Sequence, residues 1–440
     1  MHVPKKVAWA LHIPNFSAMA SFAATSSSPA ASTLDIQSAD KPLRFGMQII
    51  QWILISIGNL GLWFSIYNQV HSTSWPRPIR KMSEKVLGVL VLLSFGWFLL
   101  SVLKARSISV ADFQAFSWFH AIYLYLCLLL GVVFSIRWCL RNLIGKPRCL
   151  IQRSQSIVDL QKRIGENVYT NSRARLLASI PLNRAHVLST DKRTLAIKGL
   201  PPELEGLKIC HLTDWHLMDQ ISRRWFEEVV IESNLQQPDL VLITGDLLDE
   251  KECLDWIDPV FGQLKSKYGS FFIRGNHDRR VGDQEVLLDR MQQAGMQWVG
   301  DGNWHRIDIN GATIDLAGNE LPWFEEADQL PAKERQADSD SRALRVLLTH
   351  SPDQYKWALE RDFDLILAGH NHGGQIRLPV IGPLVAPSKY GVRFAGGTYQ
   401  LGNTAMHVSR GLSGDKCLRI HCPPELAVIT LACDKTKPKG

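Results

Sequence analysis

Apolar positions follow two different patterns, one before about residue 137 and another after about residue 185. Residues 47–67, 86–103 and 116–136 contain no Asp, Glu, Lys or Arg, and each run is near the roughly 20 residues that a helix needs to cross a bilayer core. Three such runs between basic flanks favour membrane helices over buried helices of a soluble domain. We therefore predict a membrane region over residues 46–137 with three transmembrane helices.

After residue 185 the apolar runs are short and alternate with amphipathic stretches. Strand-like runs such as "LKICHL", "LVLIT" and "LRVLLT" are separated by helix-like stretches such as "SRRWFEEVVIES" and "EVLLDRMQQAG". Strands that alternate with helices are typical of a layered α/β domain, which we place at residues 185–440. Near its end, Gly402 and Asn403 separate two β-like runs and predict a hairpin.

Two further segments flank the membrane region. Residues 1–45, which include "SSSPAAS", are low in complexity, and we predict that they are disordered. Residues 138–184 are predicted to form a basic juxtamembrane linker with helical character. Between Arg137 and Arg175 the chain has nine Lys or Arg and two acidic residues, so this stretch carries 9 − 2 = +7, which equals the formal net charge of the whole chain.

This distribution of charge favours one kind of partner over another. A charge confined to one segment beside apolar helices indicates contact with membrane lipid, and nucleic acid is not expected as a partner. The flanks on the side of the C-terminal domain carry nine Lys or Arg, against six on the opposite side, which predicts that this domain is cytoplasmic. The eight cysteines form no CxxC pair, which argues against a disulfide framework or a cysteine zinc site and favours a reducing compartment.

Side chains that can bind metals or move protons follow five of the predicted strands, at the point where each strand ends. They are Asp214 and His216, Asp246 and Asp249, Asn276 and His277, His350, and His370 and His372. Sites in open α/β sheets form at the carboxyl ends of the strands. We therefore expect these residues to converge on one edge.

The chemistry of this set is that of a metal site. Imidazole, carboxylate and amide oxygen, without thiolate, suit Mn, Fe or Zn. The candidates suffice for two divalent metal ions, and such a pair, roughly 3.5–4 Å apart, can clamp both the attacking and the leaving oxygen of a phosphoryl group. Each residue alone has an ordinary explanation, such as a helix N-cap for Asp246 or a turn for Asn276. The whole set would then require five coincidences at five strand ends.

Five sequence blocks in a fixed order carry a resemblance to a known family. They are DxH at 214–216, GDxxD at 245–249, GNHD at 275–278, a lone His350 and GHxH at 369–372. Together they resemble the calcineurin-like metallophosphoesterases over roughly residues 200–430, and the tail "GHNHGGQIRLPVIGPLVAPSKYG" is similar to the bacterial membrane-anchored branch. The resemblance implies an α/β fold, a four-layer sandwich of two mixed β-sheets flanked by helices, preceded here by an α-helical membrane region.

The resemblance also implies a role for each residue. The first ion would be held by Asp214, His216 and His372, the second by Asn276, His350 and His370, and both by Asp246. A hydroxide between the ions would attack phosphorus, His277 would protonate the leaving oxygen, and Asp249 would orient His277. Trp215 is bulkier than the residue often found inside DxH, and we expect it to shape the rim of the pocket. Four further histidines match no block and are predicted to be structural, namely His211, His305, His407 and His421.

The leading hypothesis is a membrane-anchored two-metal phosphoesterase of the bacterial inner membrane, which hydrolyses a phosphate ester or a pyrophosphate bond. The position beside the bilayer favours a lipid-linked substrate, and a soluble phosphodiester is the other option. Two alternatives are a catalytically inactive membrane sensor or scaffold and a nuclease. The complete set of candidate ligands disfavours the first, and the lack of a basic face outside residues 138–184 disfavours the second.

Overall fold

The computed structural model describes residues 36–73, 75–104, 118–143, 145–330, 343–414 and 416–434. The chain divides into two units, Met1–Ile50 and Gln51–Gly440, and every element described below belongs to the second unit except the first part of helix α1. The segment that we predict to be disordered lies outside the described residues up to residue 35. From Ile36 onward the chain is helical, which corrects the prediction for residues 36–45.

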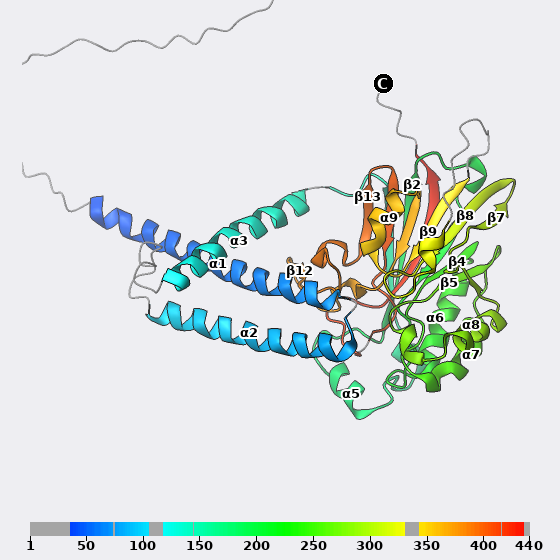
Figure 1. Cartoon of the computed structure of the whole chain (residues 1–440), viewed down its shortest axis with the longest axis horizontal. Helices are drawn as coiled ribbons and strands as arrows, with labels where there is room; N and C mark the ends of the chain where they lie inside the picture. Colours follow the sequence, from blue (N-terminus) through cyan, green and yellow to red (C-terminus); the bar gives the residue numbers. More distant parts are fainter. Residues whose placement is uncertain are drawn as a thin grey trace, which may run out of the picture. The chain divides into compact units, whose positions relative to one another are not determined.

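Three helices contain the predicted membrane spans (Figure 1). They are α1 Ile36–His71, α2 Arg77–Lys104 and α3 Trp118–Leu143. Their segments Gly46–His71, Pro78–Leu100 and Trp118–Arg141 are long and apolar enough to cross a membrane, which confirms the three predicted helices. Large apolar side chains such as Leu92 and Leu93 are exposed, as expected for helices whose surroundings are lipid.

Seven strands form the first sheet, in the order β1-β2-β15-β3-β4-β5-β6. They are β1 Leu150–Asp159, β2 Val187–Ile197, β3 Lys208–Leu212, β4 Leu240–Thr244, β5 Ser270–Ile273, β6 Gln297–Trp298 and β15 Glu425–Cys433. β3 to β6 run parallel, whereas β15 is antiparallel to β3 and parallel to β2. All residues of β4 are buried, as expected for a central parallel strand covered on both faces.

Six strands form the second sheet, in the order β13-β14-β10-β9-β8-β7. They are β7 His305–Ile309, β8 Ala312–Asn319, β9 Leu344–Thr349, β10 Leu365–Ala368, β13 Gly397–Leu401 and β14 Thr404–Val408. The strands β8, β9, β10 and β14 run parallel, and the edge strands β7 and β13 are antiparallel to their neighbours. Gly402 and Asn403 form the turn between β13 and β14, which confirms the predicted hairpin. A separate two-stranded hairpin consists of β11 Arg377–Leu378 and β12 Gly382–Pro383.

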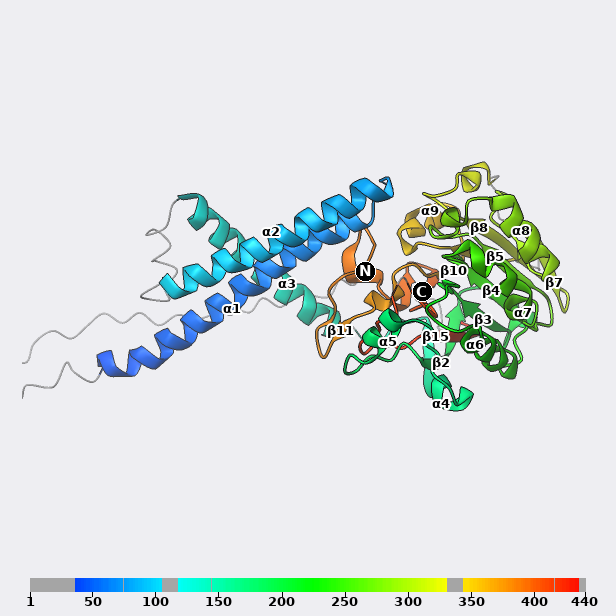
Figure 2. The same cartoon turned by 90° about the horizontal axis from the view of Figure 1, so that it is seen from below.

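Three apolar cores hold four layers together (Figures 1 and 2). Between the sheets, Ile209 and Leu242 of the first sheet pack in one cluster with Val346 and Leu367 of the second. Helices α6, α7 and α8 cover the outer face of the first sheet, and α9 covers that of the second. The predicted four-layer α/β sandwich is therefore confirmed. The remaining elements are α4 Leu160–Ile164, α5 Ser172–Ala178, α6 Arg223–Leu235, α7 Ile257–Phe261, α8 Gln284–Gln293, α9 Tyr355–Leu359 and the 3-10 turns η2 Pro202–Leu204, η3 Lys251–Trp256, η4 Asp278–Val281, η5 Glu326–Gln329, η6 Pro352–Gln354, η7 His372–Gly374 and η8 Gly391–Phe394.

Strand β1 corrects the prediction for residues 138–184. We predicted a linker with helical character, but residues 150–159 form the edge strand of the first sheet and pair with β2 along their length. This strand is exposed at most positions and carries polar residues such as Arg153 and Ser154, so it lacks the alternation that reveals a half-buried strand. The α/β domain therefore includes residues that we assigned to the linker.

Candidate metal centre

The predicted site residues lie in the loops that follow β3, β4, β5, β9 and β10. Three of these strands belong to the first sheet and two to the second, so the single edge that we expected is an edge that two sheets share. Candidate ligand atoms lie within 4.8 Å of one another in three groups, one of which, His216, Asp249 and His277, contains the predicted general acid. The other two groups consist of predicted ligands alone. The first group is Asp214, His216, Asp246 and His372, and the second is Asp246, His350 and His370.

Five of these residues have a left-handed backbone. The angle φ is +54° at Asp214, +44° at His216, +52° at Asp246, +69° at His370 and +47° at His372. Such strain costs on the order of 1–3 kcal/mol per residue and persists only where the surroundings enforce it. The N–H groups of Asp214 and His216 donate to carbonyl oxygens of the loop after β4, at 3.0 and 2.9 Å, and thereby hold the first of these loops in place. The concentration of strain at one point indicates a functional site.

In the first group, two imidazole rings and two carboxylates converge. Nε2 of His216 lies 3.3 Å from Nε2 of His372 and 3.4 Å from Oδ2 of Asp246. Oδ1 of Asp214 lies 3.5 Å from Nε2 of His372 and 3.9 Å from Nε2 of His216. The side chains are almost completely buried, so a cation bound between them would have little competition from water.

The second group also includes the predicted ligand Asn276. Nε2 of His350 lies 3.2 Å from Oδ1 of Asn276, 3.2 Å from Nδ1 of His370 and 3.2 Å from Oδ2 of Asp246. The structure thus brings every predicted ligand into one of two adjoining groups.

Asp246 is common to both groups. Its Oδ1 accepts a hydrogen bond from the N–H of His277 at 2.8 Å. Its Oδ2 is buried and accepts no hydrogen bond from the described part of the chain, although one histidine Nε2 from each group lies within 3.4 Å. Without bound metal, these two histidines form ion pairs with this oxygen. A cation on either side of this oxygen would satisfy it.

The fold also orients three of the histidine rings. Nδ1 of His216 lies 3.0 Å from Oδ1 of Asp249, and Nδ1 of His350 and of His372 donates to backbone carbonyl oxygens at 2.7 and 3.1 Å. These bonds direct each Nε2 into the two groups, which is the usual outer support of a metal-binding histidine.

The glycine before the first histidine of "GHNHGGQI" permits a close approach of two loops. A Cβ at Gly369 would lie 2.1 Å from Oγ1 of Thr213 and 2.6 Å from Oδ2 of Asp214. Because glycine has no Cβ, the loop after β10 can lie against the loop after β3. The N–H of His370 then lies 3.1 Å from both carboxylate oxygens of Asp214.

The histidines of the two groups differ in the direction in which their pKa values are shifted. Burial lowers the pKa of His370 and His372 well below the usual value, and neighbouring histidines lower it further. These rings are therefore neutral, which is the form that binds metal. Burial also opposes protonation of His216 and His350, but the nearby aspartates outweigh it and raise their pKa values to about 10 and about 9. These two rings carry protons that a bound cation would displace.

The side chains present fit divalent cations. The donors are imidazole nitrogen, carboxylate oxygen and one amide oxygen, and no cysteine belongs to either group. This donor set suits Mn, Fe or Zn. A cation would also satisfy Oδ2 of Asp246 and separate the imidazole nitrogens that now face each other.

His277 lies beside the two groups and is held at both ring nitrogens. Nδ1 forms a short hydrogen bond with Oδ1 of Asp249, the oxygen that also contacts His216, and Nε2 lies 2.9 Å from Nη2 of Arg280. Burial opposes ionisation of Asp249, but the two histidines outweigh it and lower its pKa. Asp249 therefore connects the predicted acid with a predicted ligand, a link that the motif alone does not reveal.

Asp278 has a supporting role that we did not predict. It is completely buried, and its two oxygens accept three backbone N–H groups from the loops after β4 and β5, at 2.7 to 3.1 Å. Burial and the nearby charge of Asp246 raise the pKa of Asp278 to about 7. The sequence signal for Asp278 was its position at the end of the GNHD block, but we used this block only to recognise the family.

Trp215 does not lie where we predicted, and another tryptophan, Trp323, lies beside the metal centre. Trp215 is buried in the core of the first sheet, with its ring 4.8 Å from that of Phe261, so it does not shape the pocket rim. Trp323, which lies outside all five blocks, places its ring 5.3 Å from His350 and 5.0 Å from His370. It therefore covers the second group, and no sequence signal marks it.

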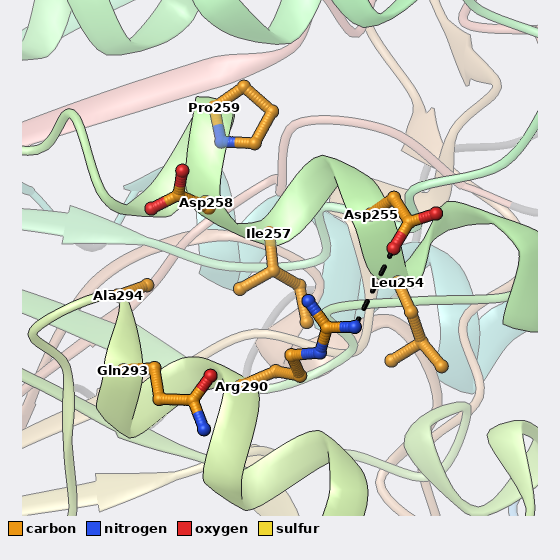
Figure 3. A pocket seen from close by; sticks show the side chains of 8 residues that line it. All are labelled: Leu254, Asp255, Ile257, Asp258, Pro259, Arg290, Gln293 and Ala294. Atoms are coloured by element: carbon orange, nitrogen blue, oxygen red, sulfur yellow. Dashed lines mark ion pairs between the residues drawn. The ribbon is translucent and has the colours of Figure 1, made fainter.

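A cavity of about 390 Å³ adjoins Asp249, the partner of His277, and several basic side chains line it. It is lined by Lys81, Arg173, Met218, Gln220, Asp249, Glu250, Arg280 and Lys416. A second cavity, of about 330 Å³, lies between η3, α7 and α8, where Arg290 faces Asp255 at 3.7 Å (Figure 3). None of the predicted site residues lines the second cavity, so the first is the one relevant to the metal centre.

Comparison with known proteins identifies the family of this part of the chain. The profile of the calcineurin-like phosphoesterase family matches residues 207–374, a range that contains all of the predicted site residues. The uncharacterized metallophosphoesterase YkuE of Bacillus subtilis is 30% identical over 250 residues, which are 56% of this chain and 86% of YkuE. The chain belongs to the calcineurin-like phosphoesterase family.

Other relatives resemble this chain to a similar degree. The phosphodiesterase YaeI of Escherichia coli is 28% identical over 236 residues, 51% of this chain and 82% of YaeI. A transmembrane protein with metallophosphoesterase domain from Bos taurus is 30% identical over 247 residues, 52% of this chain and 54% of that protein. One relative of this chain is thus named as a transmembrane protein.

Proposed function

We propose that this family member is a two-metal phosphoesterase anchored in the bacterial inner membrane, with its catalytic domain in the cytoplasm. The observation that supports the two-metal assignment most directly is the buried Oδ2 of Asp246, which lies within 3.4 Å of one histidine Nε2 from each ligand group. The residues that would hold the ions are Asp214, His216 and His372 on one side, Asn276, His350 and His370 on the other, and Asp246 between them. Ions bound there would supply Lewis acidity toward a phosphoryl oxygen and neutralise its charge.

The protein supplies the general acid, His277, and holds its ring in position. Asp249 holds Nδ1 of His277, so Nε2 is the atom that would give a proton to the leaving oxygen. Arg280 now lies 2.9 Å from that nitrogen. A phosphate group in the adjoining cavity would attract the guanidinium, and Nε2, which now accepts a hydrogen bond from Arg280, could then take a proton from solvent and give it to the leaving oxygen.

The cavity also bears on the substrate. Lys81, Arg173, Arg280 and Lys416 outnumber the two acidic residues of its lining, and Asp249 is engaged with histidines. Such a lining favours a substrate with more than one negative charge near the scissile bond. We therefore propose a phosphate ester or pyrophosphate, linked to lipid, as the substrate class.

The test uses the full-length protein in detergent. After the ions are removed with a chelator, hydrolysis of an aryl phosphate should stop, and Mn, Fe or Zn should restore it. A panel of lipid phosphates, lipid pyrophosphates and soluble diesters then identifies the preferred class. Metal binding without hydrolysis of any substrate would show an inactive scaffold and refute the proposal. A reporter fused after Gly440 tests the orientation, and activity of the fusion only outside the cell would refute the cytoplasmic assignment.

A further inference from the structure

The β11–β12 hairpin presents apolar side chains to the outside of the domain. Its strands pair Arg377 with Pro383 and Leu378 with Gly382, and the tip between them contains Val380. Val380 is 83% exposed and has φ of +66°, a conformation that a β-branched residue rarely adopts. An exposed valine in a strained turn adds nothing to the packing of the domain. A role for this side chain therefore requires a contact with something outside the domain.

A second exposed apolar segment lies next to this hairpin. The helix α5 and the turn after it leave Leu176 and Leu182 exposed. Ile420 forms one backbone bridge with Asn183 and another with Ile376, so the two segments flank the same residue. Both can be followed in Figure 2, where α5 and β11 are labelled. We call the exposed residues of the two segments the apolar rim, which consists of Leu176, Ile180, Leu182, Ile376, Leu378, Val380 and Ile381.

The two segments that carry the apolar rim have charged residues of one sign only. Residues 172–184 and 375–393 contain no Asp or Glu. They contain six basic residues, namely Arg173, Arg175, Arg184, Arg377, Lys389 and Arg393. Apolar side chains surrounded by Lys and Arg are characteristic of surfaces that lie in the interface of an anionic membrane, where each basic residue adds about 1 kcal/mol.

The backbone beside the apolar rim is bonded to the ends of two membrane spans. The Asn68 side chain donates to the carbonyl oxygen of Leu384 at 3.3 Å and accepts from the N–H of Ala386 at 3.1 Å. Arg141 donates to the carbonyl oxygen of Ile381 at 3.0 Å. Asn68 and Arg141 are among the last residues of the spans Gly46–His71 and Trp118–Arg141. The hairpin therefore lies where these helices leave the apolar layer.

The same hairpin supports the metal centre. It follows the turn η7, which begins with the candidate ligand His372. A Cβ at Gly374 would lie 2.4 Å from Cβ of Pro383, so η7 packs directly against β12. The position of the hairpin thus determines where the entrance of the metal centre lies relative to the bilayer.

We infer that the apolar rim is a membrane-contact surface, whose tip inserts among lipid headgroups while the surrounding basic side chains contact anionic lipid. The rim holds the metal centre at the bilayer surface, so that a lipid headgroup reaches it without leaving the membrane. The contact with lipid is inferred from the apolar rim alone. The supply of substrate from the bilayer rests in addition on the proposed function.

The contact is tested with a nitroxide label on the full-length protein in vesicles of phosphatidylcholine with phosphatidylglycerol. The exposed Cys139 and the partly exposed Cys433 are first replaced by Ser, since the other cysteines are buried. A label at Val380→Cys should collide several-fold more with oxygen than with a water-soluble nickel chelate, relative to a label at Leu235→Cys. Leu235 is a matched control because it is 66% exposed on α6. A label at Leu176→Cys should behave like that at Val380.

Two results would overturn the inference. One is the same ratio of collisions at all three labels. The other is protection of the rim labels from both reagents, because that indicates a protein partner or a second copy of this chain in place of lipid.

The supply of substrate is tested separately by activity. The double substitution Val380→Asp and Ile381→Asp should reduce turnover of a vesicle-borne lipid phosphate several-fold and leave turnover of a soluble aryl phosphate unchanged, whereas Leu235→Asp should change neither. Equal losses on both substrates would contradict the supply of substrate from the bilayer. If the wild-type protein hydrolyses nothing while the labels report lipid contact, the proposed function fails and the membrane-contact surface stands.

Discussion

The metal centre and the cationic cavity beside it are built in opposite ways. In the metal centre five of the seven candidate ligands are buried, five have strained backbones, and the outer nitrogens of three histidine rings are held by the fold. In the cavity, Lys81, Arg173 and Lys416 are exposed and come from three distant segments of the chain. The first arrangement resists change, whereas the second adapts to what enters it. The comparison suggests that the buried groups perform the chemistry and the exposed cations select the substrate.

The largest effect is expected from Asp246→Asn, because Asp246 is the one carboxylate common to both ligand groups. The loss of its charge weakens the attraction between the protein and both bound ions. We expect turnover of every substrate to fall by about 10³-fold or more, since metal ions supply several kcal/mol of transition-state stabilisation. Steady-state kinetics on an aryl phosphate and on a lipid phosphate measure this. A loss confined to one substrate would place Asp246 among the selecting groups.

The next effect is expected from His277→Ala. It should reduce kcat by roughly 10²–10⁴-fold, the usual contribution of a positioned general acid, while the bound metal is retained. The loss should shrink with a substrate whose leaving group needs no proton. Kinetics with a series of aryl phosphates, together with metal analysis, test this. Loss of metal from this variant would show that His277 is a ligand.

A smaller effect is expected from Asp249→Asn. The structure indicates that this substitution affects two histidines, whereas the sequence indicated only one. Because Oδ1 of Asp249 contacts both His277 and His216, the substitution disturbs the acid and one ligand together. We expect both kcat and metal affinity to fall by roughly 10–100-fold, as is typical for outer partners of metal-binding histidines. Titration of the metal-free protein measures the affinity. An unchanged affinity would mean that His216 does not depend on Asp249.

The smallest effect is expected from Arg280→Gln, which tests the cavity. Arg280 is partly exposed and contacts Nε2 of His277, and it is the cation nearest to the predicted acid. We expect KM to rise about tenfold, since a hydrogen bond from a charged group contributes about 1.5–3 kcal/mol when buried and less here. The matched control is Arg290→Gln in the other cavity, which should change nothing. Equal effects of the two substitutions would remove the distinction between the cavities.

The sequence predicted the parts of the site that depend on local pattern. Each candidate ligand follows an apolar run, and a strand that ends in a polar loop is visible in one chain without knowledge of its neighbours. What depends on contacts between distant segments was not visible. Examples are Trp323 over His350, the double role of Asp249, and the shared edge of two sheets. Strand β1 was missed for a different reason, because an exposed edge strand needs no apolar alternation.

The central claim is that Asp246 lies between two cation sites, and the metal content of the full-length protein tests it most directly. After loosely bound ions are removed, we predict two ions per chain in the wild type. His372→Ala should lose the ion of the first group and His370→Ala that of the second, so each should keep about one, whereas Asp246→Asn should lose both. A single ion in the wild type that disappears in both histidine variants would contradict the account, because all the ligands would then serve one cation.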